Sequence, residues 1–116
     1  MMVDVIHAVG KPNLGTLPDF GNWCTSKQWG GINGECEVAY DMYQGVKDFM
    51  PYAKGVSAKA YEFDDNGNDT RIDFKKMMGI VQSFDFDGYI GVEYEGSELS
   101  EYEGIRKTKT LIDKSY

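Results

Sequence analysis

The sequence contains few of the residues on which the simplest small frameworks depend. Its 116 residues include three prolines, two cysteines and one histidine. Two cysteines are too few for the disulfide framework of a small secreted domain. No apolar run approaches the roughly 20 residues that a membrane-spanning helix requires. We therefore expect neither a disulfide scaffold nor a contact with a membrane.

Basic residues are also in short supply. The chain has 19 acidic and 12 basic residues, a net charge of −7, and the basic residues form no patch. A surface of this sign repels the phosphates of nucleic acids and anionic lipids, so we expect neither as a partner. The opening residues lack the basic start and the apolar run of a signal peptide. We therefore interpret Cys24 and Cys36 as reduced thiols in a cytoplasmic protein.

What the sequence does have is material for a core and a regular alternation of segments. Hydrophobic residues make up 41% and aromatic residues 14% of the chain, which excludes disorder. The length suits a single domain over residues 1–116. Hydrophobic periodicity predicts, in order, a helix over 2–9, an extended segment over 14–17, a helix over 35–50, a strand over 55–63, a helix opening at 70–73, a strand over 89–94 and a helix opening at 100–103.

This alternation is typical of parallel strands joined by helical crossovers. Three such strands with helices on one side leave the other face and both edges open. A closed barrel of eight units takes about 250 residues. We therefore predict an α/β fold that forms the C-terminal part of a (β/α)8 TIM barrel, with about three parallel strands. The open face also predicts that the chain forms a homo-oligomer.

Reactive residues of a parallel barrel lie at the C-terminal ends of its strands. Carboxylates beside a lysine at such a place suit a hard divalent cation and an oxygen-rich substrate. The predicted strands bring there Asp19, Ser57, Lys59, Tyr61, Glu93 and Glu95.

Each of these residues also has a structural interpretation. Asp19 precedes a loop, where aspartate commonly forms turns or caps. Glu93 interrupts a strand of Ile, Val and Tyr, where a carboxylate needs a cation or a hydrogen-bond partner, and structural ion pairs meet that need too. Lys59 can simply neutralise these carboxylates. The acidic run over 64–69 lacks the glycine position and the closing Glu of a calcium loop, so we interpret it as a solvated turn.

Three segments of the chain are familiar when they are taken together and in order. They are GTLPDFGN at 15–22, GVSAKAY at 55–61 and GYIGVEYEG at 88–96. Over nearly its whole length the chain resembles the C-terminal part of the sugar phosphate isomerase/epimerase family, which belongs to the xylose isomerase-like TIM barrels. The resemblance implies a divalent metal (Mn, Mg or Zn) held at the strand tips by a Glu, an Asp, a His and a second Glu.

The resemblance also implies roles for individual positions. Asp19 matches the Asp ligand, and Glu93 matches the last Glu, which can also act as an acid/base. Lys59 matches a lysine that faces the substrate, whereas Ser57 stands where relatives carry the histidine ligand. Serine is a poor substitute for imidazole at zinc or manganese. The implied metal is therefore bound differently, weakly or not at all, and the first Glu lies on a strand that these residues do not include.

The activity implied is that of a sugar or sugar-phosphate isomerase or epimerase. A carboxylate removes a proton next to a carbonyl, and the metal stabilises the resulting enediolate. Glu93 and Lys59 are the expected catalytic residues, and Asp19 and Glu93 the expected metal ligands. Substrate contacts are expected from Asn22, Ser57, Tyr61 and Glu95.

Two other functions stay open on the sequence alone. A catalytically silent half-barrel module would associate with itself to cover its open face. A metal-dependent endonuclease is the third possibility, because the same superfamily includes abasic-site nucleases. The excess of acidic residues and the missing histidine make the endonuclease the least favoured of the three.

Overall fold

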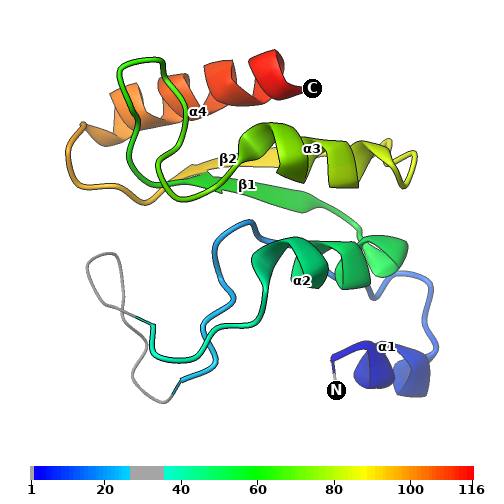
Figure 1. Cartoon of the computed structure of the whole chain (residues 1–116). Helices are drawn as coiled ribbons and strands as arrows, with labels where there is room; N and C mark the ends of the chain where they lie inside the picture. The colour runs from blue at the N-terminus through cyan, green and yellow to red at the C-terminus, as the bar shows by residue number, and fades with distance from the viewer. Residues whose placement is uncertain (1, 27–35) are drawn as a thin grey trace.

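The computed structural model describes residues 2–26 and 36–116 and shows a mixed α/β fold (Figure 1). Its elements in chain order are α1 (Met2–Val9), α2 (Met42–Phe49), the 3-10 helix η1 (Met50–Tyr52), β1 (Val56–Ala60), α3 (Phe74–Gln82), β2 (Ile90–Tyr94) and α4 (Glu101–Ser115). Within the described ranges, no helix has the length and apolarity needed to cross a membrane.

Strands β1 and β2 form a two-stranded parallel sheet, and α3 is the helical crossover between them. Val56 lies opposite Ile90, and Lys59 lies opposite Glu93. The Val56 amide donates to the carbonyl oxygen of Tyr89 at 3.0 Å, which opens the pairing at the start of both strands. The predicted parallel β-α-β order is confirmed for this part of the chain.

The extended segment predicted near residue 17 lies along the other edge of β1. Thr16 and Asp19 form isolated parallel bridges with Ala53 and Ser57. The Ser57 amide donates to the Pro18 carbonyl oxygen at 2.9 Å, and successive amides of a strand point to opposite edges. Pro18 has no amide proton to give to a ladder, which helps to keep this segment from pairing regularly. A complete third strand is therefore not formed, and the wider barrel stays a prediction.

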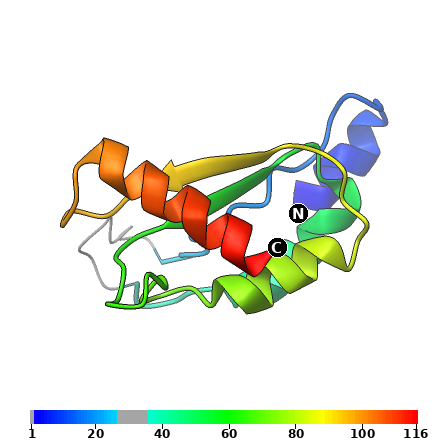
Figure 2. The same cartoon turned by 90° about the horizontal axis from the view of Figure 1, so that it is seen from above.

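Helices cover one face of the sheet. Helices α3 and α4 lie on the same side of β1 and β2 (Figure 2), and α2 packs against α3. On that side, Val56, Ala58 and Ala60 of β1 are at most 1% exposed. They pack against apolar side chains of the helices, which include Val46, Met77, Met78, Val81, Leu111 and Ile112. In the described part of the chain, no helix covers the opposite face of β1 and β2 (Figure 2).

The start of α4 follows the sequence closely, whereas α3 starts later than predicted. Ser100 caps α4 by accepting from the Glu103 amide, which confirms the predicted opening of this helix at 100–103. Helix α3 begins at Phe74 rather than at Thr70, because Asp73 is itself the cap and accepts from an amide of the first turn.

Helix α2 is also shorter than the predicted helix over 35–50. It begins at Met42, with Asp41 as its cap. The residues before the cap form no helix, and Ala39 forms an antiparallel bridge with Cys24. Residue 35, where the prediction began, lies outside the described residues.

The interpretation of Cys24 and Cys36 as reduced thiols is wrong, because the structure joins them in a disulfide. The antiparallel bridge between Cys24 and Ala39 brings the two segments side by side. Two cysteines exclude a framework of several disulfides but not one local pair. Disulfides persist in oxidising compartments, so the cysteines no longer support a cytoplasmic location, which stays a prediction.

Helix α4 approaches β2 closely because Gly104 has no side chain. A Cβ atom at this position would overlap the ring of Tyr94. The ring is held in place, since its hydroxyl accepts from the Leu99 amide at 3.2 Å and donates to Glu62 at 3.3 Å. A side chain at Gly104 therefore has to displace either the helix or the strand end.

We expect Gly104→Ala to lower the free energy of unfolding by about 1–3 kcal/mol, as overpacking of a core contact usually does. Alanine is otherwise the better helix former by about 1 kcal/mol. The matched control is Gly79→Ala in α3, where an added Cβ meets no atom within 4 Å and stability should rise by roughly 0.5–1 kcal/mol. Urea denaturation measures both variants, and equal stabilisation of the two would contradict the packing described.

We expect reduction of the Cys24–Cys36 disulfide to lower the free energy of unfolding by about 2–3 kcal/mol, as for other loops of this size. The two cysteines are 12 residues apart, so the bond mainly restricts the unfolded chain. Urea denaturation with and without a phosphine reductant measures the difference. The double variant with serine at both positions is the control and should not respond to the reductant. A wild-type curve that the reductant leaves unchanged would count against the disulfide.

Candidate functional site

Polar side chains gather on the face of the sheet that no described helix covers. Side chains alternate between the two faces of a strand, so Ser57 and Lys59 point away from the helices that cover Ala58. The parallel register then places Glu93 beside Lys59 on the same face. The bridge between Asp19 and Ser57 brings the preceding segment to this place as well.

Lys59 lies at the centre of this cluster, and its side chain is only 3% exposed. Its Nζ atom lies 2.8 Å from Glu95 Oε2 and 3.2 Å from Glu93 Oε1. It donates to Asn22 Oδ1 at 2.9 Å, and Asp19 Oδ1 lies 3.8 Å away. Four oxygen-bearing side chains thus surround one ammonium group. Their oxygen atoms replace the water that the buried charge has lost.

Ser57 lies beside both acidic residues on the other side of the cluster. Its hydroxyl donates to Glu93 Oε2 at 2.7 Å, and its backbone forms a parallel bridge with Asp19. Asp19 is fixed by its own loop, because its Oδ1 atom accepts from the amides of Gly21 at 2.8 Å and Asn22 at 2.9 Å. Asp19 therefore stabilises its own turn and also lies in the cluster around Lys59.

The environment moves the two acidic groups in opposite directions. Burial raises the pKa of Asp19 above its ordinary value, and the hydrogen bonds that it accepts offset this only in part. Burial also acts to raise the pKa of Glu93, but the hydrogen bond from Ser57 and the charge of Lys59 outweigh it and hold the pKa below the ordinary value. The cluster therefore contains one carboxyl group that keeps its proton more readily and one that loses it more readily.

Lys59 stays charged in this setting. Burial alone would lower the pKa of its ammonium group, but the hydrogen bond to Glu95 and the charges of Asp19 and Glu93 raise the pKa overall. The cluster thus holds a permanent cation next to two carboxyl groups of unequal proton affinity. Such an arrangement can bind an oxygen atom that becomes negatively charged and can move a proton nearby.

The structure brings the predicted site residues together. Asp19, Asn22, Glu93 and Glu95 all contact or approach the Lys59 ammonium group, and Ser57 joins Glu93. Tyr61 lies at the margin, where its hydroxyl donates to the Gly21 carbonyl oxygen at 3.4 Å and its ring packs under Arg71, whose Cζ lies 4.6 Å from the ring centroid. The catalytic and substrate-binding roles assigned to these residues stay predictions.

The donor set does not favour the predicted metal. Within the described residues, no group of three or more His, Cys, Asp and Glu side chains is arranged to hold a metal ion. Asp19 and Glu93, the two predicted ligands, both face the Lys59 ammonium group. Ser57, in the position of the expected histidine, gives its proton to Glu93. The Ser57 hydroxyl is therefore already hydrogen-bonded to a carboxylate. It is a neutral oxygen, not the imidazole nitrogen that the resemblance implies as a metal ligand.

Sequence reasoning missed several residues that support the cluster. The indole Nε1 of Trp23 donates to the Asp19 carbonyl oxygen at 2.7 Å. Asp69 accepts from the Tyr61 amide at 2.6 Å, and Glu62 accepts from the Ser97 amide at 2.6 Å. A tryptophan in a polar loop has to satisfy its N–H group when it is partly buried, and this was the one signal in the sequence for such a support.

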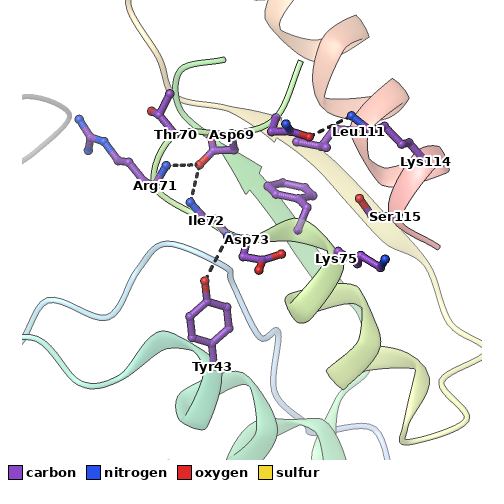
Figure 3. Close-up of a pocket in the computed structure, with 12 residues that line it drawn as sticks. Tyr43, Asp69, Thr70, Arg71, Ile72, Asp73, Lys75, Leu111, Lys114 and Ser115 are labelled. Atoms are coloured by element: carbon purple, nitrogen blue, oxygen red, sulfur yellow. Dashed lines mark hydrogen bonds between the residues drawn. The ribbon is translucent and has the colours of Figure 1, made fainter. Parts of the chain in front are cut away.

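A separate hollow of about 490 Å³ lies among the helices and the loop before α3. Asp69 and Asp73 are among its lining residues, together with Tyr43 (Figure 3). Asp69 accepts from the amides of Arg71 and Ile72 at 2.8 and 2.7 Å, and the Tyr43 hydroxyl accepts from the Asp73 amide at 3.1 Å. These bonds shape the turn into α3, so the polar groups here serve the fold. None of the residues around Lys59 lines this hollow.

Comparison with known proteins does not extend this picture. No model of a known protein family matches the chain, and neither does any curated protein. The functional interpretation therefore depends on the geometry of the cluster and on the resemblance of its three sequence segments.

Proposed function

We propose that this chain carries the acid–base site of a sugar or sugar-phosphate isomerase or epimerase, as the later part of a parallel β/α barrel. One observation carries the proposal: the Lys59 ammonium group lies within 4 Å of the carboxylates of Asp19, Glu93 and Glu95. A cation for the carbonyl oxygen and carboxylates for the proton are the parts that proton transfer next to a carbonyl requires.

Glu93 is the base in this proposal. It takes the proton from the carbon next to the carbonyl, and the electrons of the broken C–H bond form the enediolate. A Lys59 N–H group donates to the oxygen that gains the negative charge. The proton returns to the neighbouring carbon in an isomerase, whereas in an epimerase a second acid donates a proton to the opposite face of the same carbon. In isomerisation a second proton also passes from one substrate oxygen to the other.

Asp19 is the second carboxyl group, and it lies beside Ser57, the residue that donates to Glu93. The raised pKa of Asp19 suits it to hold the proton between the two halves of the reaction. Carboxyl groups whose environments separate their pKa values are a recurrent feature of acid–base sites. The positions of Asp19 and Glu93 on neighbouring strand segments allow one substrate to touch both.

The substrate has to reach a lysine that is almost fully buried. The three shortest contacts of Nζ, to Glu95, Asn22 and Glu93, use the three N–H groups of the ammonium. The contact with Glu93 is the longest of the three at 3.2 Å, and the Glu93 side chain is 43% exposed. A carbonyl oxygen can therefore replace Glu93 at the ammonium group and free that carboxylate for the proton.

Exchange of substrate hydrogen with solvent tests the proposal. In D2O, the wild-type protein should exchange the proton next to the carbonyl in one or more of a panel of aldoses, ketoses and their phosphates, as followed by proton NMR. Glu93→Gln should slow this exchange by about 100-fold or more, which is the usual contribution of a general base. The matched control is Asp113→Asn, which removes a carboxylate paired with Lys109 at 2.6 Å on α4 and should leave the rate unchanged. Exchange of none of the panel, or exchange that Glu93→Gln leaves intact, would count against the proposal.

A further inference from the structure

Oxygen atoms of four side chains surround the Lys59 ammonium group. They come from Asp19, Asn22, Glu93 and Glu95, at distances of 2.8 to 3.8 Å from Nζ. Three of the four groups are carboxylates, which are also the preferred ligands of hard divalent cations. These oxygen atoms are therefore suited to a positive charge, and the question is which cation supplies it.

The ammonium group of Lys59 already occupies the centre of these oxygens. Divalent cations of this class lie about 2.0–2.6 Å from their oxygen ligands. The contacts of Lys59 Nζ at 2.8, 2.9 and 3.2 Å are those of charged N–H donors. A metal ion at the same place would overlap the ammonium group and add two further positive charges beside it.

Lys59 has little freedom to leave this place. Its side chain is 3% exposed, and its neighbours along β1, Ala58 and Ala60, are fully buried in the core. The strand therefore fixes the backbone from which the side chain extends. Glu95 and Asn22 hold the ammonium group from the loops that follow the other two strand segments.

We propose that the ammonium group of Lys59 takes the place of a divalent metal as the cation of this site. The chain then binds no divalent metal among these oxygens, and a substrate oxygen meets an N–H donor of Lys59. The role of Lys59 toward a substrate rests on the proposed function. The exclusion of metal ions does not, because it follows from the contacts of the cluster alone.

Metal titration of a variant without the ammonium group tests this proposal. Lys59→Met keeps most of the side-chain length but removes the charge, which leaves Asp19, Glu93 and Glu95 without their cation. Calorimetric titration with MnCl2 should detect no saturable binding to the wild-type protein. Lys59→Met should bind one Mn²⁺ ion at least about tenfold more tightly than the wild type, since without the ammonium group the three carboxylates repel one another and a hard cation that draws them together is favoured. Circular dichroism establishes that the variant is folded.

The control is Lys109→Met, which removes a lysine from an exposed pair with Asp113 on α4. It leaves a single carboxylate and should gain no Mn²⁺ affinity. Binding of Mn²⁺ by the wild-type protein that Glu93→Gln abolishes would overturn the proposal. So would a folded Lys59→Met variant with no gain in affinity. If Lys59→Met does not fold, the comparison of wild type with Glu93→Gln decides on its own, and absence of wild-type binding supports the proposal.

These results separate the two proposals. Calorimetry measures the cation of the cluster without any turnover, whereas deuterium exchange measures proton transfer. Wild-type Mn²⁺ binding together with exchange that depends on Glu93 would overturn the present inference and leave the proposed function intact. Absence of exchange together with Mn²⁺ binding only by Lys59→Met would support the present inference and count against the proposed function.

Discussion

The open face of the sheet is organised around one buried ammonium group. A lysine removed from water is costly unless oxygen atoms replace the lost hydration. Lys59 satisfies this condition with oxygens of Asn22, Glu93 and Glu95, and with Asp19 slightly further away. These partners come from two segments that are far apart in the sequence, and Lys59 lies on a third. The ion cluster therefore links the segment before α2, strand β1 and the end of β2 on the side that the described helices leave uncovered.

The backbone makes this convergence possible. Parallel pairing places Lys59 opposite Glu93, and the core under Ala58 and Ala60 fixes the face on which Lys59 projects. Groups outside the cluster hold its loops: Trp23 supports the backbone of Asp19, and Asp69 and Glu62 hold the chain after β1 and β2. The site thus depends on core packing on one face of the sheet and on hydrogen bonds that hold the loops at the ends of the strands.

Much of the cluster could be predicted because strands obey a simple alternation. The period of two in GVSAKAY sends Ser57 and Lys59 to one face, and a carboxylate inside an apolar strand already indicated that Glu93 needs a partner. The central position of Lys59 could not be predicted, because it depends on register and distance between segments. The disulfide escaped prediction for the same reason, since Cys24 and Cys36 meet through an antiparallel bridge. The predicted start of α3 was wrong because Thr70 and Asp73 are both good N-cap residues. Only tertiary packing selects one of them.

A double-mutant cycle on Lys59 and Glu95 tests most directly whether the ion cluster holds this face together. Lys59→Met, Glu95→Gln and their combination are compared by urea denaturation, with Lys109→Met and Asp113→Asn as the cycle for an exposed pair. The account predicts a coupling of roughly 1–3 kcal/mol for Lys59 with Glu95 and no more than about 0.5 kcal/mol for the exposed pair. Equal couplings in the two cycles would contradict it.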